Sequence, residues 1–255
     1  MIGRGNGMID FHEVLSKMNP HQRINYDKVF KEMATHWIVE GIKPQILLHS
    51  CCGPCSSAVL ERLAQVADVT VYYMNPNVHP ESEYKRREYI QRKLIYKFNQ
   101  QTGNHIHFLA APYDSHSYFE AIKGQENEPE GGARCKTCFE LRMLATAQKM
   151  KELGFDYFAT TLTVSSYKNS QTVNSVGINI AESMNIPYLP SDFKKNNGYL
   201  RSTELSEEYE LYRQHYCGCI FGARDQEIDL AEVEKEAKEF MKNRNGEKDF
   251  PGIDL

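Results

Sequence analysis

The sequence predicts an α/β protein built on a parallel sheet that is flanked by helices. Short segments rich in apolar, β-branched and aromatic residues alternate with longer stretches of helical periodicity through the middle of the chain. Strands separated by helices of this length pair in parallel, because the connection must cross the sheet. A Ser-Cys-Cys-Gly-Pro turn follows the first strand-like segment directly. Ligand sites in such sheets lie beyond the carboxyl ends of the strands, so this turn is the first candidate for a functional site.

The individual elements follow from local patterns. β-branched and aromatic residues predict a strand at 69–74 that ends at an Asn-Pro-Asn turn, and Gly154 ends a predicted helix at the position where glycine is favoured. The expected strands are 45–49, 69–74, 106–109, 157–164 and 186–189, and the expected helices are 56–65, 82–101, 139–153 and 172–184.

The two ends of the chain differ from this middle part in composition. Residues 1–40 are polar, partly helical in pattern and free of cysteine. Residues 226–255 begin as an acidic, Glu- and Lys-rich helix and continue as a loose tail from Asn243 onward. We therefore expect an N-terminal helical extension (1–40), a core that carries the chemistry (41–225) and an acidic C-terminal helix and tail (226–255).

Composition excludes some classes of protein. The 255-residue chain has 41% hydrophobic residues and a formal net charge of -4. This charge excludes binding of nucleic acid through overall basicity, although one local basic face is compatible with it. No apolar run is long enough to span a membrane, and residues 1–8 lack the apolar stretch of a signal peptide. We therefore expect a cytoplasmic protein with no membrane partner.

The cysteines are the most informative residues. All seven fall in three short groups, Cys51-Cys52-Gly53-Pro54-Cys55, Cys135-Lys136-Thr137-Cys138 and Cys217-Gly218-Cys219. Cysteines that serve only as small buried hydrophobes would be scattered. In a reducing cytoplasm, clustered cysteines bind metal or carry out redox chemistry rather than form structural disulfides. The grouping therefore predicts a metal or redox site.

The first two groups together offer four ligands for an iron–sulfur cluster. The Cys135/Cys138 spacing fits zinc, iron–sulfur and dithiol-exchange sites, and the basic residues beside it favour the thiolate. The adjacent Cys51 and Cys52 suit a structural zinc site poorly, but neighbouring thiolates can bind different irons of one cluster. With Cys135 and Cys138 they supply the four sulfurs that a [4Fe–4S] cluster needs.

Two interpretations remain open for the other three cysteines, Cys55, Cys217 and Cys219. Cys217 and Cys219 would close a small, strained disulfide ring, which is easily reduced and suits redox work. Alternatively, they bind a second metal together with Cys55. Nearby, His49 is either a proton source or a packed polar residue at a strand end. A basic run at 85–97 indicates either a phosphate-binding face or a solvated helix surface.

Taken together, these segments resemble the QueH family of epoxyqueuosine reductases. The resemblance rests on the three cysteine segments at 47–55 (Leu-Leu-His-Ser-Cys-Cys-Gly-Pro-Cys), 132–142 and 211–219, and on the segments 75–84, 160–169 and 192–199. It spans residues 45–222 and leaves out the N-terminal extension and the acidic tail.

The resemblance implies a core similar to Rossmann-like nucleotide α-hydrolases and the last step of queuosine synthesis in tRNA. In that step, a two-electron reduction removes the epoxide oxygen of epoxyqueuosine at the wobble position of the anticodon and leaves a cyclopentene. The resemblance implies that Cys51, Cys52, Cys135 and Cys138 ligate a [4Fe–4S] cluster and that Cys217 and Cys219 form a redox-active disulfide pair. An additional mononuclear iron would give Cys55 a role, together with a carboxylate such as Asp114 or Asp192.

The implied chemistry suggests roles for further residues. Electrons would come from a donor such as ferredoxin or flavodoxin, and protons from His49, Tyr199 or a thiol. Aromatic and Arg side chains before the last cysteine pair suit an unpaired base and its phosphates, or equally one face of a helix. The residues expected at the tRNA are the basic run 85–97 and Arg134, Lys194, Lys195, Arg201 and Arg213.

Two other classes of protein are compatible with parts of the sequence. A zinc-stabilised RNA-binding protein would use the cysteines without redox activity. A tRNA sulfur transferase that activates its substrate with ATP could share the core, but it needs a phosphate-binding glycine loop after the first strand. The Cys-Cys-Gly-Pro-Cys turn stands where that loop would be, which disfavours ATP use.

Overall fold

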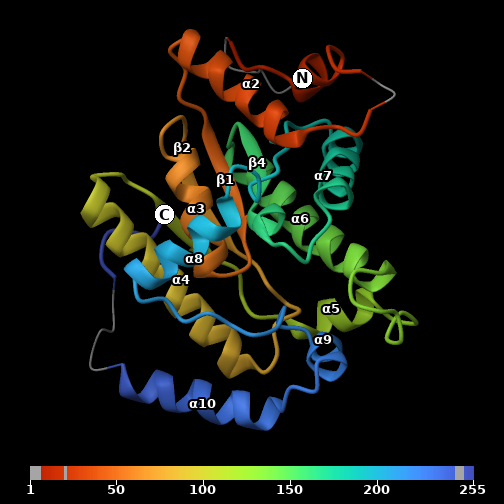
Figure 1. Ribbon diagram of the computed structural model, residues 1–255, viewed down its shortest axis with the longest axis vertical. Coiled ribbons are helices and arrows are strands. Elements are labelled where there is room, and N and C mark those ends of the chain that lie inside the picture. The colour runs from red at the N-terminus through yellow and green to blue at the C-terminus, as the bar shows by residue number, and fades with distance from the viewer. Residues whose placement is uncertain (1–6, 20–21, 245–249) are drawn as a thin grey trace.

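The computed structural model has a four-stranded sheet at its centre (Figure 1). Its strands are β1 (Gln45–Ser50), β2 (Asp68–Tyr73), β3 (His107–Ala110) and β4 (Tyr157–Thr160). Adjacent strands all pair in parallel, in the order β3-β2-β1-β4. The predicted α/β class is therefore confirmed. The structure describes residues 7–19, 22–244 and 250–255, so most of the 1–8 segment considered for a signal peptide lies outside the described residues.

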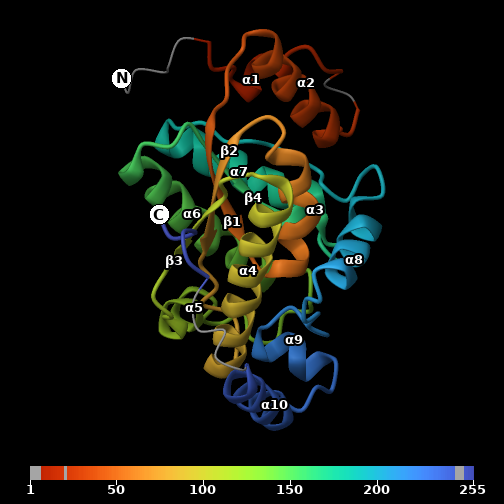
Figure 2. The ribbon, with the colours of Figure 1, turned by 90° about the vertical axis from the view of Figure 1, so that its left-hand side faces the viewer.

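Helices cover both faces of the sheet (Figure 2). On one side α3 (Gly53–Leu63) packs against α4 (Glu81–Thr102) and α8 (Gly198–Glu208), and on the other α6 (Ala133–Leu153) packs against α7 (Ser170–Met184). Because both faces are covered, the strands are apolar almost throughout, as in β1, where Ile46, Leu47 and Leu48 are fully buried. The remaining helices are α1 (Phe11–Leu15), α2 (Tyr26–Val39), α5 (Ser115–Ala121), α9 (Ile220–Asp225) and α10 (Leu230–Asn243).

Two of the expected strands differ in the structure. The segment 157–164 is a strand only to Thr160, whose side chain accepts a hydrogen bond from the Leu162 amide and starts a 3-10 turn, η1 (Thr161–Val164). Such a side-chain bond competes with the strand ladder. The segment 186–189 makes one isolated parallel bridge, between Tyr188 and Phe158, rather than a strand.

The C-terminal end is not a loose tail over the residues that the structure describes. Ile253 is buried, and its carbonyl accepts a hydrogen bond from the Phe108 amide of β3 at 2.6 Å. Asp254 forms an isolated parallel β-bridge with Phe108 of β3, and its carboxylate pairs with Arg92 of α4 at 2.7 Å. This segment therefore covers the free edge of β3, where unpaired backbone groups would otherwise be exposed.

The N-terminal helix α2 is joined to the rest of the protein by a buried carboxylate. Asp27 accepts hydrogen bonds from Arg62 of α3 at 2.7 Å and from Asn196 at 2.8 Å, and it pairs with Lys31 at 2.8 Å. Burial alone would raise the pKa of Asp27, but these three donors lower it below its usual value. The predicted division of the chain at residues 40 and 225 stays a prediction. No helix in the described part is long and apolar enough to cross a membrane.

We expect Asp27→Ala to lower the free energy of unfolding by about 1–3 kcal/mol, because partly buried donors lose a charged acceptor. Lys28→Ala, an exposed neighbour 3.6 Å from Glu32, should change it by less than about 0.5 kcal/mol. Since the folded-state pKa of Asp27 is depressed, its contribution is present at neutral pH and is lost as the pH falls through that pKa. Urea unfolding near neutral pH and in acid checks both points. Equal unfolding midpoints for Asp27→Ala and Lys28→Ala would contradict them.

Candidate functional site

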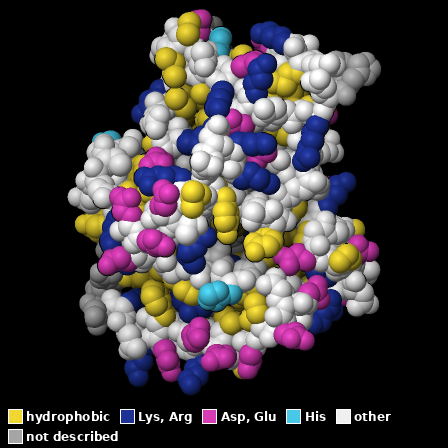
Figure 3. Space-filling view, viewed as in Figure 1, with side chains coloured by type: hydrophobic (Ala, Val, Ile, Leu, Met, Phe, Trp, Pro, Cys, Tyr) yellow, Lys and Arg dark blue, Asp and Glu magenta, His cyan; other side chains and the backbone are white. Residues whose placement is uncertain are grey.

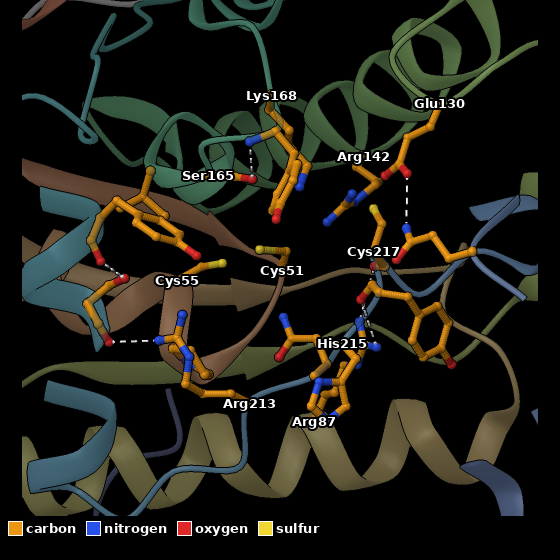
Figure 4. A pocket seen from close by; sticks show the side chains of 18 residues that line it. Cys51, Cys55, Arg87, Glu130, Arg142, Ser165, Lys168, Arg213, His215 and Cys217 are labelled. Atoms are coloured by element: carbon orange, nitrogen blue, oxygen red, sulfur yellow. Dashed lines mark hydrogen bonds between the residues drawn. The ribbon is translucent and has the colours of Figure 1, made fainter. Parts of the chain in front are cut away.

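A cavity of about 400 Å³ lies beyond the carboxyl ends of the strands (Figure 4). Residues of α3, α4, α6 and α8 line it, together with the segments 164–168 and 213–217. Elements far apart in the sequence thus meet at one place, as the rule for open α/β sheets predicts. Three of the seven cysteines, Cys51, Cys55 and Cys217, contribute to its wall.

Cys51, Cys52 and Cys55, which we call the first thiol group, follow β1 and enter α3. Their sulfur atoms all lie within 4.8 Å of one another, and those of Cys51 and Cys52 are 3.8 Å apart. Hydrogen bonds from the Cys52 and Cys55 thiols lower the pKa of Cys51 well below its usual value. Burial raises the pKa of Cys52 to about 12. Hydrogen bonds with Cys51 and Cys52 raise the pKa of Cys55 well above its usual value. The group therefore holds one readily ionised thiol beside two that remain protonated unless a metal replaces their protons.

The backbone of this turn requires Gly53. A Cβ atom there would lie 3.0 Å from the Ile90 side chain and 3.1 Å from the Ile90 carbonyl oxygen of α4. The missing side chain lets α3 begin directly against α4, so that the three thiols stay at the end of β1. Ser50, the last residue of β1, is fixed below them by hydrogen bonds to Ser56 and Gln91, each at 2.6 Å.

Cys135, Cys138, Cys217 and Cys219 form the second thiol group. Cys135 and Cys138 lie in the first turns of α6 rather than in a turn before it, so their three-residue spacing puts them on one helix face. Burial raises the pKa of Cys138 to about 12; nearby Arg142 opposes this rise, and the thiols of Cys217 and Cys219 contribute to it. Burial and the same two thiols also raise the pKa of Cys135. All seven cysteines are among the described residues, and none is in a disulfide.

Two cationic side chains, Arg142 and Lys168, lie near sulfur atoms of both thiol groups. Arg142 of α6 is 1% exposed, lies 3.9 Å from the Cys138 sulfur and donates to Asn75 at 2.6 Å. Burial alone would lower the pKa of Arg142, but Cys138, Cys51 and Cys217 raise it. Lys168 lines the cavity, and its pKa is raised against the effect of burial by Cys217, Cys51 and Cys55. Figure 4 shows both side chains beside the labelled cysteines. A fixed positive charge thus lies near both groups, where it favours thiolates.

The last cysteine segment is held by α4. Arg87 is buried, pairs with Glu83 at 2.7 Å and donates to the Cys217 carbonyl at 3.1 Å. Gly218 has a φ of +114°, and a Cβ there would lie 2.8 Å from Arg87 Nη1. Earlier in the segment, Gln214 Nε2 donates to the Cys52 sulfur at 2.8 Å. The segment therefore lies across the first thiol group.

His49 has the location of a packed polar residue. It is fully buried, and its ring nitrogens lie 2.9 Å from Thr160 Oγ1 and 3.3 Å from the Met74 carbonyl. Burial, together with nearby Arg142, lowers the pKa of His49 to about 3. A neutral, fully enclosed imidazole is a poor proton donor at neutral pH, so this location argues against the predicted catalytic role. Tyr199, the other predicted donor, lines the cavity and is 41% exposed.

The residues expected at the tRNA differ in location. Arg213 lines the cavity and Lys195 is exposed, whereas Lys194 donates to the Lys168 carbonyl. Arg201 of α8 pairs with Glu61 of α3 at 2.8 Å and does not line the cavity. Arg134 is 1% exposed and donates to carbonyl groups of the preceding loop. Its location argues against a direct contact with RNA.

For the basic run 85–97, which we interpreted as either a phosphate-binding face or a solvated helix surface, the structure shows little free positive charge. Arg86 and Arg87 are buried on α4 against Glu83. The remaining members pair with carboxylates at the surface, as Lys97 does with Glu210 at 2.9 Å. The run is therefore largely neutralised by its own neighbours.

Sequence reasoning missed several residues of the site. Lys168, Arg142 and Gln214 stand within recognised segments, but nothing in their local pattern indicated that they face the thiols. The carboxylate that lines the cavity is Glu130, which accepts a hydrogen bond from Gln226 at 3.0 Å. Asp114 caps α5 and Asp192 accepts from Ser170, and neither lines the cavity.

Comparisons with known proteins agree on one family. A family model described as "Epoxyqueuosine reductase QueH" matches residues 46–225. A protein of that name from Streptococcus pyogenes serotype M1 is 53% identical over 246 residues, which are 96% of each chain. One from Staphylococcus epidermidis is 45% identical over 92% of this chain and 99% of its own, and one from Thermotoga maritima is 30% identical over 74% and 96%.

Proposed function

The chain belongs to the QueH family of epoxyqueuosine reductases, and we propose that it removes the epoxide oxygen of epoxyqueuosine in tRNA with the help of a cysteine-bound [4Fe–4S] cluster. Membership makes it an oxidoreductase that acts on tRNA. The reaction takes two electrons and two protons. Both carbon–oxygen bonds of the epoxide break, a carbon–carbon double bond forms, and the oxygen leaves as water.

The observation that carries the cofactor proposal is the convergence of sulfur donors. The first thiol group has three sulfurs within 4.8 Å of one another, and Arg142 faces sulfurs of both groups. Thiolates are the ligands of iron–sulfur clusters, and buried cations offset part of their negative charge. The donor set therefore fits such a cluster. Ligands on different irons of one cluster need not touch, so a set divided between two groups is compatible with it.

We assign Cys51, Cys52, Cys135 and Cys138 to the cluster. Cys55 then lies beside Cys51 but is not a ligand of the cluster, and Cys217 lies at the cavity wall. We propose that these two, with Cys219, serve an additional iron or a thiol–disulfide exchange. When bound, the metal centre would deliver electrons from a donor such as ferredoxin or flavodoxin.

The chain's own residues would bind and orient the substrate. Lys168 and Arg213 bring positive charge to the cavity wall, where the modified base must enter. Tyr199, whose hydroxyl has no hydrogen-bond partner among the described residues, is the group that we propose as proton donor. On the face shown in Figure 3, Lys and Arg side chains are most frequent in the upper half, and acidic side chains are most frequent toward the bottom, over α10. An uneven surface of this kind lets a protein with a net charge of -4 bind RNA on one side.

Purification without oxygen, followed by visible absorption and metal analysis, tests the cofactor. We expect a brown protein with a broad band near ~400 nm that bleaches on reduction with dithionite, and about four irons and four sulfides per chain. The zinc-stabilised RNA-binding protein is the second candidate, since three thiols within 4.8 Å also suit a single ion. A colourless protein that holds zinc and cannot be reconstituted with iron and sulfide would support it and contradict the cluster.

A further inference from the structure

Two exposed aromatic side chains stand at the same cavity. Of the seven large hydrophobic residues that are exposed in the described part of the chain, only Tyr167 and Tyr199 are aromatic, and they are 84% and 41% exposed. Both line the cavity that contains the thiols. A large aromatic surface left in water at the mouth of a pocket indicates a contact that the isolated protein lacks.

Neither ring is held in place by a hydrogen bond of its hydroxyl group within the described residues. Within the described residues, the only hydrogen bond of Tyr167 runs from its backbone amide to Ser165 at 3.3 Å. The backbone around both residues is nevertheless fixed. The carbonyl of the next residue, Lys168, accepts a hydrogen bond from the Lys194 side chain at 2.6 Å. The Tyr199 carbonyl accepts one from the Ser202 hydroxyl at 2.6 Å in the first turn of α8. The rings are therefore presented from anchored elements.

Two cations line the same cavity as the two rings. Lys168 follows Tyr167 directly and faces the cavity, and Arg213 enters the same cavity from the segment before the last cysteines. Aromatic rings beside cations are the usual means of holding single-stranded nucleic acid, because bases stack on the rings while the cations meet the phosphates. A protein partner would instead use a wider apolar patch.

We propose that Tyr167 and Tyr199 form an aromatic clamp that stacks on an unpaired base of the tRNA anticodon loop and thereby delivers the modified nucleotide to the thiols. This inference rests on the proposed function and deepens it, because it names the residues that hold the substrate. Lys168 and Arg213 neutralise the phosphates next to the clamped base.

Binding of an unmodified anticodon stem-loop RNA, followed by fluorescence anisotropy at fixed salt, tests the clamp. Tyr167→Ala and Tyr199→Ala should each weaken binding about 5- to 100-fold, the range for loss of one base–aromatic stack. Tyr167→Phe and Tyr199→Phe should bind within about 2-fold of the unchanged protein, because the ring remains. Leu200→Ala is the matched control, since Leu200 is 56% exposed on the same helix but does not line the cavity. It should not alter binding.

The double variant distinguishes a clamp from two separate contacts. If both rings hold one base, Tyr167→Ala with Tyr199→Ala should weaken binding by less than the product of the single effects. A product of the single effects would overturn the clamp, and so would alanine variants that bind RNA as tightly as the unchanged protein. Visible absorption and thermal unfolding of each variant identify misfolding. If the unchanged protein itself binds no RNA, the proposed function fails instead.

Discussion

Cys135→Ala is expected to remove the iron–sulfur absorption and to lower the turnover of epoxyqueuosine tRNA by about 100-fold or more, since a ligand contributes at least as much as its outer-shell partners. Cys135 stands in the first turn of α6, and the amide of Gly131 donates to its sulfur at 3.2 Å. Its thiol therefore already has the hydrogen bond that a bound thiolate needs. On the ligand set that we propose, this variant would leave one iron of the cluster without a protein partner.

Cys55→Ala separates the two possible ligand sets. The cluster assigned to Cys51, Cys52, Cys135 and Cys138 predicts that this variant keeps about four irons per chain, although its turnover falls. A metal held by the first thiol group alone predicts the opposite, because Cys55 would then be a ligand and Cys135 would not. Glu140→Ala, at an exposed position of α6, is the control for both and should change neither iron content nor turnover. Full iron content in Cys135→Ala would contradict the assignment.

Gly218→Ala should lower turnover at least about 10-fold and the free energy of unfolding by about 1–3 kcal/mol. Gly218 has a φ of +114°, and its Cβ would lie 2.8 Å from both Arg87 Nη1 and Val78 Cγ2. Arg87 cannot yield easily, because it is buried against Glu83 and holds the Cys217 carbonyl. The backbone between Cys217 and Cys219 must therefore move, and the two thiols move with it.

Gly103→Ala is the matched control for this effect. Gly103 also has a positive φ, +72°, but a Cβ there would meet nothing within 4 Å. It should lose about 1 kcal/mol of stability through backbone strain and keep its turnover. Single-turnover kinetics with urea unfolding of both variants checks the difference. If Gly218→Ala turns over as fast as Gly103→Ala, the fixed geometry of the last cysteine segment does not matter for the reaction.

Local pattern was a good guide to the elements of the core. The strands β1, β2 and β3 and the helix α4 agree with expectation to within about two residues, because burial on both faces and a glycine end at Gly103 leave plain signals. The strand at 157–164 was predicted too long, since the hydrogen bond from the Leu162 amide to the Thr160 hydroxyl ends it early. Apolar content alone does not reveal such a bond.

The locations of charged residues were hard to predict from local pattern. A surface location is the default for Arg, yet Arg134 and Arg87 are buried. Glu83 pairs with Arg87, whereas within the described residues only Nη1 of Arg134 donates to carbonyl groups and its Nη2 lies 3.6 Å from Asp225. The Glu83 partner could have been inferred from its spacing to Arg86 and Arg87 on one helix. The contact of Gln214 with the Cys52 sulfur joins residues 162 positions apart, so no local sequence pattern predicts it.

The most direct test of this account is a single turnover of the dithionite-reduced protein with tRNA that carries epoxyqueuosine, in the absence of oxygen and of any other reductant. Mass spectrometry of the nucleosides measures the product, while visible absorption measures the cluster. We expect queuosine, lighter by one oxygen, to form as the absorption of the oxidised cluster returns. The cluster supplies one of the two electrons, and the second comes from the redox element that we propose at Cys55, Cys217 and Cys219. A fully loaded, reduced protein that binds the tRNA but leaves epoxyqueuosine unchanged would contradict the account.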